Sequence, residues 1–302
     1  MKASVLIAVI TVVLITCYAV AYSQSKKTSP VTAKGATVNR VASDFRFTEG
    51  PAVDPEGNVF FTDQPNDRIL KWSATDGSIT VFMEGAGRSN GLYFDTEGKL
   101  LSCADLKNEL WRIDKDKKAT VLVADFEGKK LNGPNDLWVH PSGGVYFTDP
   151  FYKRDYWNRT EKEIEQENVY YLSPDGSVSV AATGLVQPNG IVGTSDGKRL
   201  YVADIGDKKT YSYAINNDGT LSDRKEFVPM GSDGMTIDQK GNVYLTGKGV
   251  TIFNASGEQI DHIDVDAPWT ANVCFGGKDR KTLFITASTS VYTLKMMVAG
   301  AR

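Results

Sequence analysis

One pattern recurs six times in this chain and limits what it can fold into. Each copy has a polar residue, a short apolar segment, a turn rich in Gly, Asp and Pro, and a second apolar segment. The copies are TEGPAVDPEGNVFFTD, SNGLYFDTEGKLLSCAD, PNDLWVHPSGGVYFTD, PNGIVGTSDGKRLYVAD, SDGMTIDQKGNVYLTG and ANVCFGGKDRKTLFITA. A repeat of about 45 residues without helical periodicity is typical of a propeller. The pattern therefore predicts an all-β, six-bladed β-propeller of four-stranded antiparallel blades.

The strands of single blades can be read from the alternation of apolar segments and turns. The second repeat contains GLYFD, KLLSCAD, ELWRID and ATVLVAD, and the fifth contains GMTID, NVYLTG, VTIFN and IDHIDV. The sixth offers only VCFGG, TLFITA and VYTLKM before the chain ends, so its blade lacks an outer strand. Since an open edge needs a cover, we expect the segment TVNRVASDFRF before Glu49 to supply that strand and close the ring.

The amino terminus predicts export. One Lys precedes a nearly unbroken apolar run from Val5 to Val20, and Ala21-Tyr22-Ser23 suits signal peptidase, so residues 1–23 are interpreted as a secretory signal. An uncleaved membrane anchor and a lipoprotein signal ending at Cys17 are the alternatives. Residues 24–35 are then a linker and residues 36–302 the propeller, located in the periplasm or secreted.

Charge and cysteine content exclude some partners and constraints. A net charge of -3 and a pI near 5.6 argue against nucleic acid, which needs clustered Lys and Arg. No association stripe is evident, so a monomer that leaves the membrane after signal cleavage is expected. Cys103 and Cys274 fall in blades that do not touch, which predicts buried free thiols rather than a disulfide.

The residue that opens each repeat bears a side-chain oxygen. In a propeller the first strand of every blade lines the central channel, so these residues should form a ring at one level: Glu49, Asn90, Asn135, Asn189, Asp233 and Asn272. Convergent acceptors are costly to bury unless something satisfies them. A hard cation, calcium first, suits carboxylate and amide oxygens. A water-filled polar channel is the alternative.

Other metals are less suited to this ring. Magnesium and manganese remain alternatives, and zinc is disfavoured because neither His140 nor His262 falls in the ring and no Cys does. His140 is expected in a turn and His262 in a solvated outer strand.

The third repeat carries an insertion, PFYKRDYWNRTEKEIEQEN, at residues 150–168. Its aromatic residues follow directly on the second strand of the blade: Phe151, Tyr152, Tyr156 and Trp157. The insertion is either a surface loop that packs its own rings or a lid over a ligand pocket.

The motifs TEGPAVDPEGNVFFTD, LNGPNDL, QPNGI, SDGM and NVCFGGKDRKTLFITA resemble the gluconolactonase, regucalcin (senescence marker protein) and luciferin-regenerating-enzyme-like family, from about Phe45 to Leu294. This resemblance implies a six-bladed propeller in which one divalent cation, usually calcium, serves the hydrolysis of sugar lactones. It places the metal ligands at the matching motif positions: Glu49, Asn135, Asn189 and Asp233.

The expected reaction is the opening of a sugar lactone. Calcium would polarise the carbonyl oxygen, Asp233 would orient or deprotonate the attacking water, and Glu49 would act in catalysis as a pure ligand. Substrate contacts are expected from six side chains: Asn90, Arg88, Asp149, Tyr152, Trp269 and Asn272. A blade-turn role for Asp149 is equally consistent with the recurring TD and AD pairs.

Two rival functions remain open at this stage. Phosphotriesterase-type hydrolysis could use the same cation, although the chain lacks the channel histidines of paraoxonases and squid-type phosphotriesterases, which puts a histidine base in doubt. A calcium-stabilised propeller that binds a ligand without turnover is the non-catalytic alternative.

Overall fold

The computed structural model describes residues 29–301, and the predicted signal peptide lies outside these residues. The described chain forms six four-stranded antiparallel sheets, the blades of a propeller, as predicted. It includes no helix with the length and hydropathy that a membrane span requires. The single helical element of the described part is a short 3-10 turn, η1 (Gln64–Asn66).

The first three blades follow one another along the chain. Blade one contains β2 (Thr48–Val53), β3 (Val59–Asp63), β4 (Arg68–Trp72) and β5 (Ile79–Glu84). Blade two contains β6 (Ser89–Phe94), β7 (Leu100–Ala104), β8 (Glu109–Ile113) and β9 (Ala119–Val123). Blade three contains β12 (Leu137–Val139), β13 (Val145–Asp149), β14 (Glu167–Leu172) and β15 (Val178–Leu185).

Blades four and five repeat this order, and blade six combines the two ends of the described chain. Blade four contains β16 (Pro188–Gly193), β17 (Arg199–Asp204), β18 (Lys209–Ile215) and β19 (Leu221–Val228). Blade five contains β20 (Met235–Ile237), β21 (Val243–Gly247), β22 (Gly249–Phe253) and β23 (Gln259–Ile263). Blade six contains β24 (Asn272–Gly276), β25 (Thr282–Ala287), β26 (Ser290–Lys295) and β1 (Asn39–Ala42).

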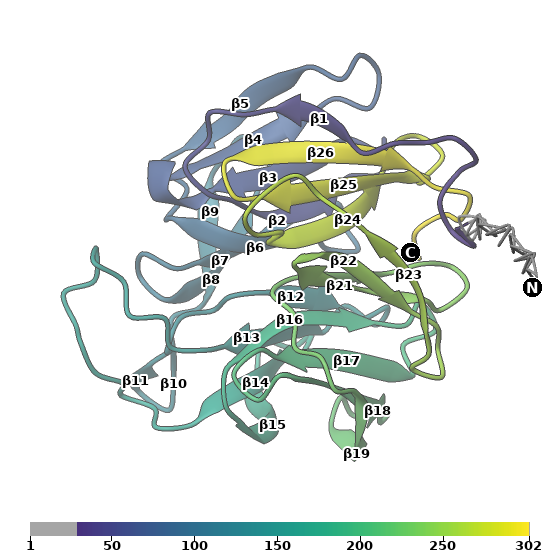
Figure 1. Ribbon diagram of the computed structural model, residues 1–302. Coiled ribbons are helices and arrows are strands. Elements are labelled where there is room, and N and C mark those ends of the chain that lie inside the picture. Colours follow the sequence, from purple (N-terminus) through teal and green to yellow (C-terminus); the bar gives the residue numbers. More distant parts are fainter. Residues whose placement is uncertain (1–28, 302) are drawn as a thin grey trace, which may run out of the picture.

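The predicted closure of the ring is confirmed. Strand β1 pairs antiparallel with β26, with Asn39 opposite Thr293 and Arg40 opposite Tyr292. Figure 1 shows β1, in purple, lying along the yellow β26 at the edge of the last sheet. The carboxyl-terminal blade therefore obtains its outer strand from the amino-terminal part of the propeller.

The packed chain begins earlier than expected. Val31, inside the stretch interpreted as linker, is 1% exposed and packs in the same apolar cluster as Met296. Its carbonyl accepts the N–H of Met297 at 2.7 Å, and Thr32 forms an isolated β-bridge with Met296. Residues 29–35 thus extend the cover of the last blade, which their mainly polar composition did not indicate.

The core lies between blades because neighbouring residues of a strand face opposite sides of its sheet. In β3, Phe60 faces blade two and its ring lies 5.2 Å from that of Phe94. The next residue, Phe61, faces blade six, with its ring 5.5 Å from that of Phe284. One strand thereby joins its blade to both neighbours.

A hairpin of β10 (Asp125–Phe126) and β11 (Lys129–Lys130) between blades two and three was not predicted. The two cysteines within residues 29–301 are buried free thiols, as predicted: Cys103 in blade two and Cys274 in blade six. Burial raises the pKa of Cys274 to about 12, so this thiol is kept in its neutral form.

Candidate functional site

In blades one and three, a threonine on the second strand bonds to the start of the next blade's inner strand. In blade one the Thr62 hydroxyl donates to the Asn90 carbonyl oxygen at 3.1 Å. In blade three the Thr148 hydroxyl donates to the Asn189 carbonyl oxygen at 2.8 Å. The Thr of the TD pair and the polar residue that opens the next repeat are therefore hydrogen-bonded partners, which fixes the height of the ring residues.

Glycine follows several ring residues because neighbouring backbones approach closely there. A Cβ atom at Gly91 would lie 2.5 Å from the Asn135 carbonyl oxygen, and one at Gly190 would lie 2.4 Å from that of Asp233. Any side chain at these positions would push the inner strands apart. The N-G pair thus reflects the narrowing of the channel at the ring.

Asp233 is bound through both of its carboxylate oxygens. Its Oδ1 accepts the Nδ2 of Asn189 at 2.9 Å, and its Oδ2 accepts the Nε1 of Trp269 at 2.6 Å. Asn189 Nδ2 also donates to the Tyr152 hydroxyl at 2.8 Å. Four of the predicted residues therefore meet at one end of the channel. They come from blade four, blade five, the segment before blade six and the insertion: Asn189, Asp233, Trp269 and Tyr152.

Glu49 adds a second carboxylate to this end. Its side chain is 3% exposed, and its Oε2 accepts the N–H of Gly50 at 2.9 Å. Burial, followed by the negative charge of Asp233, raises the pKa of Glu49 well above its usual range. Burial likewise raises the pKa of Asp233 to about 6, although the bonds from Trp269 and Asn189 oppose this rise. Two negative charges are brought together here in a poorly solvated position.

Two of the ring asparagines, Asn135 and Asn189, have side-chain oxygens without a partner among the described residues. Among residues 29–301, no hydrogen bond reaches the side-chain oxygen of Asn135 or of Asn189. The described residues contain no group of three or more His, Cys, Asp or Glu side chains arranged to hold a metal. The candidate donor set instead consists of two carboxylates and two amides, an all-oxygen set that fits a hard cation.

Asp136 is a buried carboxylate that the sequence analysis missed. It is 6% exposed, accepts the N–H of Leu137 at 2.9 Å, and contacts the Nδ2 of Asn272 at 3.4 Å. Burial raises its pKa to about 7. A signal was present, because Asp136 occupies the position after the ring residue, where Gly91 and Gly190 stand in other repeats.

The other predicted contact residues differ in position. Asn90 and Asn272 are both 5% exposed, and Asn272 faces Asp136 from blade six. Arg88 lies over the ring of Tyr156 at 4.4 Å and donates to a backbone carbonyl, that of Pro65, at 3.0 Å. Arg88 therefore supports the insertion rather than reaching the ring carboxylates.

Asp149 has the blade-turn geometry that the sequence had left open. It is 0% exposed, and its two oxygens accept the N–H groups of Asn132 at 2.9 Å and Gly133 at 2.7 Å. Burial raises its pKa to about 7 against these two bonds. The carboxylate is thus fully engaged with the backbone of its own blade.

Neither histidine belongs to the ring. The Nε2 of His140 is paired with the Gly197 carbonyl oxygen at 3.0 Å, and its Nδ1 with the Ser142 hydroxyl at 2.7 Å, in the expected turn. His262 is exposed on β23 beside the Thr251 hydroxyl. The geometry therefore gives no role to histidine at the candidate site.

The insertion forms one wall of this end of the channel. Residues 150–166 have no regular structure before β14 begins at Glu167. The rings of Phe151 and Trp157 lie 5.6 Å apart, and the indole of Trp157 donates to the Asp105 carbonyl at 2.8 Å. The aromatic side chains of the insertion thus pack together, as one interpretation predicted. Tyr152 from the same loop bonds to Asn189, one of the six residues that open the repeats.

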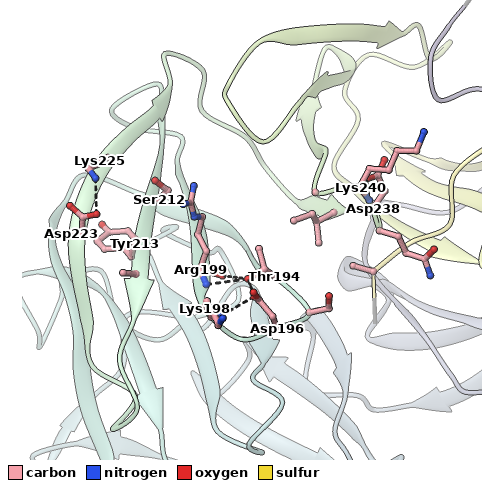
Figure 2. A pocket seen from close by; sticks show the side chains of 16 residues that line it. Thr194, Asp196, Lys198, Arg199, Ser212, Tyr213, Asp223, Lys225, Asp238 and Lys240 are labelled. Atoms are coloured by element: carbon pink, nitrogen blue, oxygen red, sulfur yellow. Dashed lines mark hydrogen bonds and ion pairs between the residues drawn. The ribbon is translucent and has the colours of Figure 1, made fainter.

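The protein also has two cavities that are not lined by Glu49 or Asp233. One of about 520 Å³ is lined by residues of blades four and five, and Figure 2 shows Asp223, Lys225 and Tyr213 on one side with Asp238 and Lys240 on the other. It contains no ring residue. The second, of about 380 Å³, is lined by the later residues of all six inner strands and reaches Asp136 and Asn272.

Comparison with known proteins identifies the family. The model of the SMP-30/gluconolactonase/LRE-like region matches residues 47–289. The chain belongs to this family. Over 291 residues it is 31% identical to the gluconolactonase of Zymomonas mobilis, covering 86% of this chain and 81% of that protein. Over 263 residues it is 26% identical to the pentonolactonase XacC of Haloferax volcanii, covering 83% and 85%.

A solved structure agrees with this family membership. The gluconolactonase of Xanthomonas campestris superposes with a TM-score of 0.82 at 29% identity, covering 88% of this chain and 91% of that one. The chain is therefore an enzyme of the gluconolactonase-like group of lactone hydrolases. The resemblance inferred from the five motifs is confirmed.

Proposed function

We propose that this enzyme hydrolyses a sugar lactone with calcium held at the ring end of the channel. The observation that carries the proposal is the pair of buried, interacting carboxylates Glu49 and Asp233, with the Asn189 amide nitrogen donating to Asp233. We take the unpartnered side-chain oxygens of Asn189 and Asn135 as the two remaining ligands. The regucalcins of the same family support calcium, and a regucalcin from Agrobacterium tumefaciens is a calcium-binding protein.

Calcium bound by these four residues would supply a Lewis acid for the lactone carbonyl oxygen. The protein would supply orientation. Asp233 is held through both oxygens, by Asn189 and by Trp269, so its carboxylate has one fixed direction in which to accept a proton from water. We propose Asp233 as the residue that orients or deprotonates this water, and Glu49 as a ligand.

The side chains around the mouth are suited to a polyhydroxylated ring. Trp269 is 38% exposed although its indole nitrogen is bound to Asp233, so its apolar face is available to cover a sugar. Tyr152 accepts the Asn189 amide through its hydroxyl, and Asn189 also donates to Asp233. We propose that these two aromatic residues border the substrate, and that the enzyme is exported through its amino-terminal signal.

A pH-stat assay of glucono-1,5-lactone opening tests this function. Turnover above the spontaneous rate is expected with calcium, should disappear after chelation, and should return when calcium is added back. Asn135→Ala should weaken the calcium dependence, whereas Asn216→Ala, in an exposed turn, is the matched control. Calcium binding without any lactone opening would contradict the enzyme and favour a binding propeller.

A further inference from the structure

In four blades an aspartate ends the second strand or directly follows it, and three of these aspartates make the same pair of hydrogen bonds. The four are Asp63, Asp105, Asp149 and Asp204. In three blades the carboxylate accepts the two N–H groups just before the inner strand of its own blade, those of Arg46 and Phe47, Asn132 and Gly133, or Val186 and Gln187. In these three blades the aspartate therefore has a structural role, which is to hold the segment that leads into the inner strand.

Asp105 departs from this rule. Its carboxylate is 2% exposed, and within residues 29–301 no backbone N–H donates to it. Its Oδ2 instead accepts the Nε of Arg154 at 3.0 Å and the hydroxyl of Tyr156, both on the insertion. Gln64 contacts the same oxygen at 3.4 Å. A carboxylate that elsewhere secures its own blade is here directed toward the loop at the channel mouth.

This contact fixes the direction of the Arg154 side chain. The guanidinium lies 5.0 Å from the centre of the Tyr152 ring, and Tyr152 is itself bonded to Asn189 in the ring. The same Asn189 amide also donates to Asp233 at 2.9 Å, so Tyr152 and Asn189 link Arg154 to this carboxylate.

One edge of the guanidinium is left for a ligand. The Nε is occupied by Asp105, but the two Nη groups donate to no residue in the described part of the chain. The side chain is 24% exposed. A planar fork with two parallel donors therefore lies beside the ring, held from behind by a buried carboxylate.

We propose that Arg154 determines substrate specificity by donating through its two Nη groups to hydroxyls of a neutral sugar lactone, and that Asp105 is the positioning residue for it. This inference rests on the proposed lactonase function. A neutral substrate is favoured because Asp105 already balances the charge of Arg154.

The test compares two lactones that differ in hydroxyl groups. Glucono-1,5-lactone carries them, whereas δ-valerolactone has the same ring size and none. In Arg154→Met we expect kcat/KM for gluconolactone to fall about ten- to hundredfold, mainly through KM, because a charged donor to substrate is lost. Turnover of δ-valerolactone should change little, because it has no hydroxyl for the arginine to bind.

Two further variants separate positioning from folding. Arg154→Lys keeps the charge but has no fork, so it should lose most of the preference for gluconolactone while remaining folded. Asp105→Asn should lose part of the preference for gluconolactone over δ-valerolactone. Asp204→Asn is the matched control, since its carboxylate binds only backbone N–H groups. It should lower the melting temperature and leave the ratio of the two kcat/KM values unchanged.

The outcomes are distinguishable. An equal fall for both lactones in Arg154→Met and Arg154→Lys would overturn the proposal, because it would make Arg154 a clamp for the loop alone. Unchanged discrimination in Asp105→Asn would remove the positioning role. If the unaltered enzyme opened neither lactone in the presence of calcium, the proposed function itself would be wrong.

Discussion

The two ends of the central channel are built from the same six inner strands but differ in the share of polar side chains that they present. At the starts of the strands lie oxygen-bearing side chains, including the buried carboxylates Glu49 and Asp233. Farther along, the same strands line a cavity of about 380 Å³ with mainly apolar residues such as Leu92, Met235 and Phe275. The ring end is costly to fold and suited to chemistry, whereas the other end stabilises the fold.

Asp233→Asn should have the largest effect and should lower activity without lowering stability. Loss of the proposed base should lower kcat about 10²- to 10⁴-fold. The melting temperature without calcium should hold or rise, because one of two neighbouring buried charges disappears. Turnover by pH-stat and melting by calorimetry check the two parts. Full turnover with calcium still bound would contradict the assignment of the base.

Phe275→Ala, at the apolar end, should have the reverse profile. The side chain is 3% exposed and packs against Tyr244, with ring centres 5.2 Å apart. Its removal should cost about 3–5 kcal/mol in the free energy of unfolding, measured by denaturant titration. At a temperature where the variant is folded, kcat/KM should match the unaltered enzyme. A tenfold loss there would show that the two ends are coupled.

Calcium should stabilise the enzyme through the ring end only. At a hundredfold excess over its Kd, a ligand of the folded state adds about 2.7 kcal/mol, which appears as a higher melting temperature. Glu49→Gln should lose most of this increase, and Phe275→Ala should keep it. An equal increase in both variants would place the cation elsewhere.

Asp175→Asn, in an exposed turn far from both ends, should have the smallest effect. Hydrogen bonds from Ser173 and Ser177 lower the pKa of Asp175 to about 2. Because the folded pKa is below the unfolded one, the stabilisation is present above about pH 4 and disappears as the pH falls toward 2. Melting temperatures of variant and unaltered enzyme should therefore converge in acid. A difference that grows in acid would contradict this sign.

The sequence predicted the parts that repeat. Six residues in one register, from Glu49 to Asn272, defined the ring, and the missing strand of blade six predicted the role of β1. Asp136 was not predicted as a buried carboxylate of the channel, because the repeats were aligned on the residue before it. Arg154 escaped for a different reason: an insertion has no counterpart in other repeats, so only the folded chain shows that Asp105 holds it.

The pairing of β1 with β26 also orders the events of folding. A chain is made from its amino end, so β1 is synthesised early, while its partner is among the last strands to emerge. Blades one to five can form as their own segments become available, but blade six requires both ends together. Closing so long a loop is slow, because its entropy must be lost before the pairing is gained. The complete propeller is therefore a property of the finished chain.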